Sequence, residues 1–448
     1  MKPIYPILLL FITFSYTSYA QESEPLKETP ISTPRLSFKI DKEGESKIDM
    51  GIGLQAWGRY AWLNPSSLDR NTGEPVDTYS DFDIRRARIS ALVSAKGRYF
   101  FYTQFGNTSI SPFTGRSTRM FFHDFWGQFK FNKSLYIGAG QHFFTGLSRL
   151  TQISYVSILT LDNPSFNFPN INVSDLFGRQ IGIFVHGEIG KLRYQAAWNT
   201  PLLDPNATLT DEQIISLQEV NIAQNRKHSN YSFRGYVDWG FFDRVNYSVT
   251  PFKGTTYLGE KGTILNLGTG FQWTPEASGI LESDGSVSKH GQLSLAVDVF
   301  FEKPLPNNSA LSVYGVFYRY DYGDNYLWKT TPLGGVASAP STGDIPLQGV
   351  GIQQFTFGTG YVSYLSTGYL LPFKFKKYQR FMPFGALAIK DLDALEDTSV
   401  QYDAGLHYMI YKHALKITAQ YSSRPIYRSD ATLEGHKGMI VMQMQFKL

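Results

Sequence analysis

The sequence contains no cysteine, and this excludes several kinds of chemistry from the start. The chain can form no disulfide, no zinc–thiolate site and no thiol nucleophile, and it cannot carry an acylated cysteine anchor. Long apolar runs are also missing. After the N-terminal segment, no stretch reaches the roughly 18 apolar residues that a membrane-spanning helix needs. Lipoproteins and helical membrane proteins are therefore excluded.

Charge is scarce as well. Charged residues make up 18% of the chain, whereas soluble domains carry about 25%. The formal net charge of +4 is too small to indicate nucleic-acid binding. In place of charge the chain has 15% aromatic residues and 40 glycines. A length of 448 residues could hold two or three soluble domains, but this composition favours a membrane β-barrel, whose strands are only half apolar.

The sequence divides into three segments. Residues 1–20 have the features of a secretory signal, with Lys2 at the start, the apolar core Ile7–Phe14 and a small-residue cleavage site. Residues 21–47 are polar and proline-rich, which predicts a periplasmic tether and not a domain. Residues 48–448 are predicted to form a barrel in the outer membrane of a Gram-negative bacterium.

The most informative stretch runs from Asp81 to Gly106. Two strands joined by a turn at Lys96-Gly97 fit it, because alternate side chains of a strand point to opposite faces. One face of the first strand is small and apolar and the other is polar: Ile89, Ala91, Val93 and Ala95 oppose Arg86, Arg88, Ser90 and Ser94. Arginines behind an apolar outer face need water, which the lumen of a transmembrane barrel supplies. The aromatic run Tyr99–Tyr102 is predicted to belong to the interfacial aromatic girdle.

The same alternation predicts about 16 antiparallel strands, an even number as expected for a bacterial single-chain barrel, with short periplasmic turns and long extracellular loops. Besides the two strands within 81–106, they are expected at 48–63, 121–131, 135–144, 180–190, 191–200, 231–242, 263–273, 292–301, 311–320, 353–366, 379–390, 400–411, 414–424 and 438–448. The last strand ends at the chain terminus, as a barrel-closing strand should.

Arg85 breaks the alternation, because it shares the parity of Ile89 and Val93, which should face lipid. A charge at that depth would cost about 2–4 kcal/mol. Either Arg85 lies at the rim, or a β-bulge shifts the register and turns both Arg85 and Arg86 toward the pore.

Basic side chains predicted to line the pore set its expected ion preference, since rings of positive charge favour anions. They are Arg59, Arg85, Arg86, Arg88, Lys130, Arg193 and Lys416. Inward carboxylates at Asp49, Asp124, Glu188, Asp298 and Asp403 oppose them. These charges could instead pair across the lumen and only hold its water network. The sequence thus predicts a mild anion preference, with phosphate as a candidate because guanidinium groups bind it through two parallel hydrogen bonds.

Two stretches show no strand pattern. Thr145–Gly178 is rich in Asn, Ser and Pro, and it is a candidate constriction loop that folds into the lumen, although it could also rest on the rim. Asp243–Gly262 could hold another strand, but this would make the count odd. It is therefore assigned to a long periplasmic connection.

Signals for catalysis are missing. The sequence has no GxSxG elbow, no HExxH motif and no Walker A loop. Its 8 histidines show no metal-ligand spacing. We expect no cofactor and no enzymatic activity.

Several motifs together resemble the phosphate-selective porin O and P family, in particular its members from the Bacteroidota. The resemblance rests on Arg85-Arg86-Ala87-Arg88, on Gly140–Leu150, on Asp175–Gly182 and on Asp243–Gly270. It implies a 16-stranded and commonly trimeric porin whose third extracellular loop narrows the channel. It also implies that Arg85, Arg86 and Arg88 are pore arginines.

The predicted function is therefore passive diffusion of small hydrophilic solutes, above all small anions such as phosphate. The alternatives are a loop-plugged barrel that acts in binding or adhesion, and an outer-membrane enzyme, for which the chain offers no triad. Expected partners are membrane lipids, lipopolysaccharide and two further copies of the chain in a homotrimer, but no nucleic acid.

Overall fold

The computed structural model describes residues 36–69, 72–110, 120–144, 146–168, 178–200, 224–225, 231–246, 248–282, 284–330, 345–373 and 379–448. The predicted signal, most of the predicted tether and residues 201–223 lie outside these ranges. No helix among the described residues is long and apolar enough to cross a membrane.

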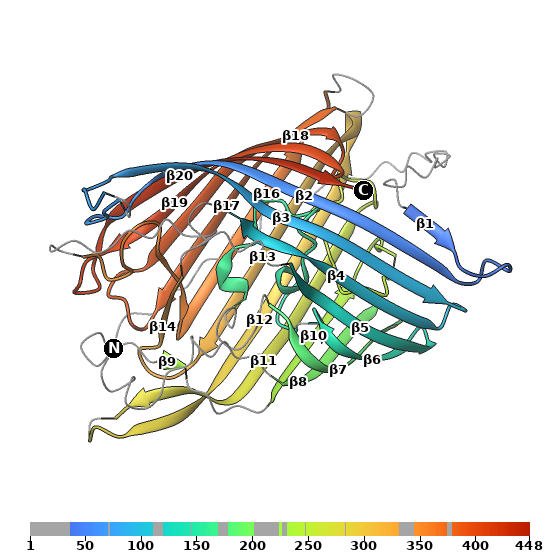
Figure 1. Cartoon of the computed structure of the whole chain (residues 1–448), viewed down its shortest axis with the longest axis horizontal. Coiled ribbons are helices and arrows are strands. Elements are labelled where there is room, and N and C mark those ends of the chain that lie inside the picture. Colours follow the sequence, from blue (N-terminus) through green and yellow to red (C-terminus); the bar gives the residue numbers. More distant parts are fainter. Residues whose placement is uncertain are drawn as a thin grey trace, which may run out of the picture. The chain divides into compact units, whose positions relative to one another are not determined.

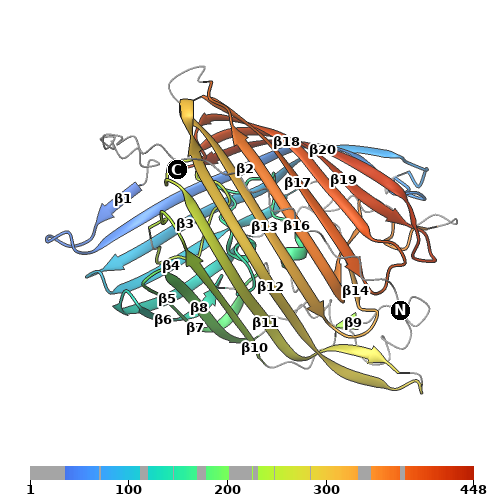
Figure 2. The same cartoon turned by 180° about the vertical axis from the view of Figure 1, so that it is seen from behind.

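Sixteen antiparallel strands form one closed barrel, as predicted (Figures 1 and 2). They are β2 (Lys47–Trp62), β3 (Thr78–Ala95), β4 (Tyr99–Ile110), β5 (Phe121–Asn132), β6 (Leu135–His142), β7 (Gln180–Ile189), β8 (Leu192–Thr200), β10 (Ser232–Gly240), β11 (Ile264–Leu281), β12 (Val287–Leu305), β13 (Ser309–Asp321), β16 (Gly360–Leu370), β17 (Arg380–Leu392), β18 (Ser399–Tyr411), β19 (Leu415–Tyr427) and β20 (Leu433–Lys447). The barrel closes where Gly53–Ala61 of β2 pairs with Met439–Lys447 of β20.

The two faces of the wall differ as the alternation predicts. On β20 the side chains of Ile440, Met442 and Met444 are exposed on the outside, whereas Gln443 and Gln445 are buried in the lumen. Closure leaves no sheet edge with unpaired backbone groups, which is what hydrocarbon requires of a spanning sheet. The apolar exterior, the polar interior and the closed wall together identify an outer-membrane barrel.

Strand boundaries differ from the prediction in three places. The stretch predicted as one strand at 353–366 divides between β15 (Gln354–Gly358), which pairs with β14 (Leu327–Thr330) inside a loop, and the wall strand β16. β11 continues to Leu281, beyond its predicted end at 273, and β12 begins at Val287, before its predicted start at 292. Within the predicted tether, Leu36–Lys39 forms the short strand β1, which pairs with β2. The remaining short elements are β9 (Gln224–Asn225), η1 (Leu150–Gln152), η2 (Ser165–Asn167) and η4 (Pro306–Asn308).

β-Bulges re-aim two side chains that simple alternation would turn to lipid. On β3, Gln55 pairs with Arg86 and Ala56 with Ile84, so Arg85 is the inserted residue. The bulge alternative for Arg85 is therefore confirmed. On β5 the register shifts in the same way opposite Gln104, and His123 turns into the wall's interior, where it is fully buried. In the sequence His123 shares the parity of Phe125, whose side chain is exposed on the outside, and the bulge turns His123 the other way.

Candidate functional site

Residues 143–179 connect β6 to β7, and their described part (143–144, 146–168 and 178–179) lies in the lumen; we call this connection the constriction loop. The loop starts against the wall formed by β10 to β13. There the carboxylate of Asp298 accepts hydrogen bonds from the Arg149 backbone N–H (2.5 Å), the Tyr236 hydroxyl (2.9 Å) and the Tyr314 hydroxyl (3.1 Å). Gly270 allows the close approach, because a Cβ there would lie 2.6 Å from the Leu147 carbonyl oxygen.

Further tyrosines of β13 hold the middle of the loop. The hydroxyls of Ser148 and Tyr318 share a hydrogen bond of 2.7 Å, and Tyr320 donates to the Phe166 carbonyl at 2.6 Å. Both tyrosines are fully buried and their rings stack 5.5 Å apart. These contacts of β13 with the loop use neutral groups and ring packing.

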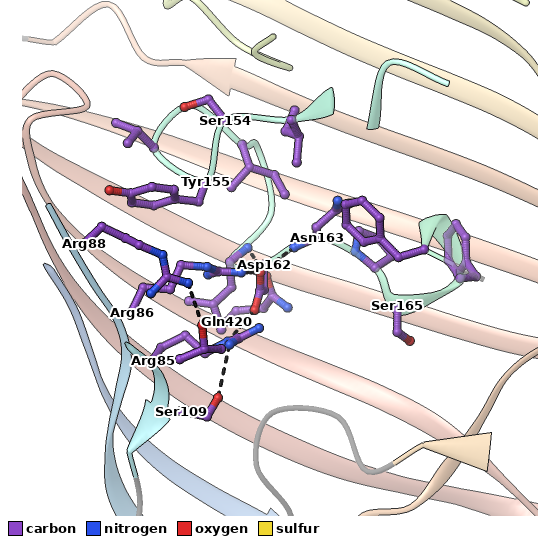
Figure 3. Close-up of a pocket in the computed structure, with 18 of the residues that line it drawn as sticks. Arg85, Arg86, Arg88, Ser109, Ser154, Tyr155, Asp162, Asn163, Ser165 and Gln420 are labelled. Carbon is purple, nitrogen blue, oxygen red and sulfur yellow. Dashed lines mark hydrogen bonds and ion pairs between the residues drawn. The ribbon is translucent and has the colours of Figure 1, made fainter. Parts of the chain in front are cut away.

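On its other side the loop reaches β3, which carries Arg85, Arg86 and Arg88; we call this side of the barrel the arginine-bearing wall (Figure 3). Asp162 pairs with Arg85 at 2.7 Å and with Arg86 at 2.6 Å, and the Arg86 guanidinium also donates to Gln55. Burial raises the pKa of Asp162, but the two arginines outweigh it and bring that pKa down to about 2. Asp162 therefore stays ionised at neutral pH, and one carboxylate is shared by two cations.

Residues 241–263, which connect β10 to β11, also enter the lumen; we call them the inner connection. The prediction of a long connection without a wall strand is confirmed for its described part. The Ser154 N–H donates to the Lys253 carbonyl and the Lys253 N–H to the Gln152 carbonyl, both at 2.7 Å. Arg149 adds a 2.8 Å hydrogen bond from its Nε to the Gly254 carbonyl. The loop and the connection are thus one hydrogen-bonded unit across the lumen.

Lys253 ties the inner connection to the wall, 2.6 Å from Asp238 of β10. Burial lowers the pKa of Lys253, while the neighbouring Asp238 opposes this shift.

Between the arginine-bearing wall, the constriction loop and the inner connection lies a cavity of about 630 Å³, which we call the basic cavity. Six cationic side chains line it: Arg85, Arg86, Arg88, Arg179, Arg424 and Lys447. Two carboxylates, Asp162 and Asp403, also line it. A third carboxylate, Asp124, lies behind the lining and pairs with Arg179 at 3.0 Å. Six cations against these three carboxylates leave the cavity with an excess of positive charge.

Two of the arginines bind neutral acceptors. Arg88 donates to the Asn107 carbonyl and to the Thr108 hydroxyl, and Arg424 donates to the Asn64 side-chain oxygen at 3.1 Å. Among the described residues no carboxylate lies within ion-pair distance of either one.

Tyr155 of the constriction loop closes the space beside Arg88. Its hydroxyl fits over Gly53, where a Cβ would lie only 2.0 Å away, and its ring lies 5.7 Å from the Arg86 guanidinium carbon. Burial raises the pKa of Tyr155 although Arg88 and Arg86 oppose the shift, so the phenol remains neutral.

Four of the seven predicted pore residues lie outside the basic cavity. Arg59 is buried in an ion pair with Asp81 at 2.5 Å, its cross-strand neighbour on β3. Lys130 lies near the β5–β6 turn, with its ammonium 5.7 Å from the Tyr136 ring. Their placement near the wall ends follows from their positions along the strands, which parity does not reveal.

The other two residues, Arg193 and Lys416, lie at the end of the barrel where short turns join the strands, which we call the turn side. Arg193 faces Glu188 at 3.5 Å and lines a smaller cavity of about 80 Å³. Lys416 is fully buried near the start of β19, and within the described part of the chain its ammonium has no hydrogen-bond partner. Only Arg85, Arg86 and Arg88 come together as predicted.

Several lining residues were not singled out in the sequence. Arg424 and Lys447 have the inward parity of their strands and could have been included on that basis. Arg179 lies next to the start of β7 in a motif that carried the family resemblance. Asp162 gave no signal, because nothing local in the loop predicts its contact with β3. Tyr102 also lines the cavity and is buried, so its assignment to the aromatic girdle was wrong.

The described residues contain no group of three or more His, Asp or Glu side chains that could hold a metal ion. His407 and His413 instead contact the two inserted segments, through the Leu159 carbonyl at 2.6 Å and the Thr256 carbonyl at 3.2 Å.

No protein-family model matches the sequence, and no curated protein matches it. Solved structures of outer-membrane porins do match its fold. OprB of Pseudomonas putida has a TM-score of 0.53 at 10% identity, covering 89% of this chain and 94% of that one. An anion-selective porin from Comamonas acidovorans (TM-score 0.48, 11% identity) covers 90% and 100% of the two chains. OmpF of Salmonella typhi (0.49, 11%) covers 90% and 98%. The chain has the fold of the outer-membrane porins.

Proposed function

We propose that this protein is an outer-membrane porin whose constriction prefers small anions. The observation that carries the proposal is the excess of cations around the basic cavity: six cationic side chains line it with two carboxylates. Charges in a narrow, partly dehydrated passage act more strongly than they would in bulk water. A solute that crosses the lumen at this level therefore meets a positive field.

Phosphate is one candidate solute. Among the described residues, the hydrogen-bond acceptors of the Arg88 guanidinium are neutral oxygens, and a guanidinium can form two parallel hydrogen bonds to an oxyanion. The sequence resemblance to the phosphate-selective porin O and P family, carried by Arg85–Arg88, supports the same choice. We also propose that the barrel works as a homotrimer among lipid and lipopolysaccharide, which chemical cross-linking of detergent-purified protein would test.

The second candidate is a plugged barrel that binds a ligand without conducting it. The inner connection and the constriction loop are joined by backbone hydrogen bonds, and the β14–β15 loop adds the buried rings of Phe355 and Phe357. These three insertions occupy much of the lumen.

The test is the zero-current potential of the purified protein in a planar bilayer under a KCl gradient, with single-channel recording. Stable steps with an anion-selective potential support the proposed porin, and block by added phosphate supports phosphate as solute. Stable steps without selectivity would contradict the anion preference. Absence of steps from heat-modifiable, folded protein would favour the plugged barrel.

A further inference from the structure

The basic cavity has a second wall that carries no charge. Phe143 of the constriction loop stacks on Phe252 of the inner connection at 5.7 Å between ring centroids, and Phe168 lies 5.8 Å from Phe143. Tyr102 of β4 meets Phe252 edge-on at 5.9 Å. All four rings line the cavity. Aliphatic side chains continue this lining at Ile153, Val156, Ile158, Leu161 and Ile352.

Cations and rings meet directly at this wall. The Arg179 guanidinium lies 4.3 Å from the centroid of Phe143, and the Arg86 guanidinium lies 5.7 Å from that of Tyr155. In such a contact the guanidinium group lies over the flat face of an aromatic ring, and its N–H groups remain at the edge, where they can donate hydrogen bonds. A ligand with both a ring and an anionic head could use the two kinds of surface at once.

An inorganic anion would use only half of this lining. A cavity of about 630 Å³ lies within the range of about 300–1,000 Å³ that sites for organic small molecules occupy, and such sites combine apolar walls with a few placed polar groups. Phosphate or chloride would leave the aromatic wall in contact with water. An aromatic ring would displace that water, which is favourable.

We propose that the basic cavity selects organic anions with an apolar ring, aromatic carboxylates above all, over inorganic and small aliphatic anions of equal charge. The inference rests on the proposed anion preference and names its substrate class. The carboxylate would face Arg86 and Arg88, and the ring would lie against Phe143 and Phe252.

Phe252 is the residue on which this selectivity should depend most. It is half-buried, and it lines both the basic cavity and the smaller cavity of about 80 Å³ on the turn side. It therefore stands between the two spaces.

The test compares how strongly benzoate, acetate, phosphate and benzyl alcohol block the chloride current of the protein in planar bilayers. We expect benzoate to reach half-block at a concentration at least about tenfold lower than acetate or phosphate, a difference of about 1.4 kcal/mol. Benzyl alcohol, which has the ring without the charge, should block weakly. Phe252→Ala should remove most of the advantage of benzoate over acetate, and Phe252→Leu part of it.

Phe241→Ala is the matched control, because Phe241 belongs to the same connection but is exposed and lines neither cavity. It should leave block unchanged. Equal block by benzoate and acetate, in a channel that is anion-selective in KCl, would overturn the inference and leave the proposed function standing. Loss of anion selectivity in KCl would overturn the proposed function itself. If no steps form, calorimetric titration of the folded protein with benzoate and acetate decides: tighter benzoate binding supports the inference, and equal or no binding overturns it.

Discussion

The two walls of the lumen hold the constriction loop in different ways. The wall of β10 to β13 binds it through Asp298 and a series of buried tyrosines. The wall of β3 contacts it through the carboxylate of Asp162 and the ring of Tyr155, and it also borders the basic cavity. Dense contacts on one side therefore fix where the loop lies, and the other side borders the cavity that the cations line. Each change below alters one wall and leaves the other intact.

The largest effect is expected from Asp298→Ala in the wall of β10 to β13, which we call the anchoring wall. It removes the acceptor for the Arg149 N–H and for two buried tyrosine hydroxyls. At roughly 1 kcal/mol for each hydrogen bond, the loss of stability should be about 3 kcal/mol, measured by urea unfolding in detergent. The loop should also loosen, which would show as noisier single-channel current.

Asp298→Asn is the control for this change, because it keeps an acceptor oxygen of the same shape. It should lose much less stability than the alanine variant. If both variants were as stable as the unchanged protein, the anchoring wall would not be what holds the loop.

On the arginine-bearing wall, Arg86→Glu should shift the zero-current potential toward cations while folding is retained. It replaces a cation of the cavity by a carboxylate beside Asp162, so two negative charges would face the passage. Lys130→Glu changes charge by the same amount outside the cavity and should shift the potential much less. Equal shifts in the two variants would show that the lumen's total charge matters, and not the cavity.

The contribution of Asp162 to selectivity should be independent of pH over a wide range. The pKa of Asp162 is lowered to about 2, so its contact with Arg85 and Arg86 persists from neutral pH down to that value. Protonation below it removes one negative charge and releases two guanidiniums, which should raise the anion preference. Asp162→Asn should show the raised preference already at pH 7, measured as the zero-current potential. A titration of selectivity near pH 4 that Asp162→Asn abolishes would contradict the depressed pKa of Asp162.

The smallest effect is expected from Gly53→Ala. The added Cβ would lie 2.0 Å from the Tyr155 hydroxyl, so the ring must shift within the cavity. Conductance should change modestly, with no loss of folding. Gly58→Ala on the same strand meets only the outward ring of Phe82, at 3.3 Å, and conductance should not change.

The wall of the barrel could be predicted from the sequence because the face to which each side chain points depends on its immediate neighbours along the strand. A strand between lipid and water must alternate, and β20 does so with methionine and isoleucine against glutamine. Even the bulge at Arg85 left a local sign, since a guanidinium at a lipid-facing position is too costly to stay there. The bulge at His123 left no comparable sign, because a neutral imidazole among phenylalanines violates no simple rule.

The sequence by itself determined the closed 16-stranded wall, the inward direction of Arg86 and Arg88, and the presence of two long unpatterned connections. Only the tertiary structure decided which cations share a cavity, because parity gives a side chain's face but not its height in the barrel. It alone brought Asp162 to Arg85, and Phe252 to Phe143, across long separations in the chain. Such contacts depend on how two irregular segments pack inside a finished wall, and no periodicity in the sequence encodes that packing.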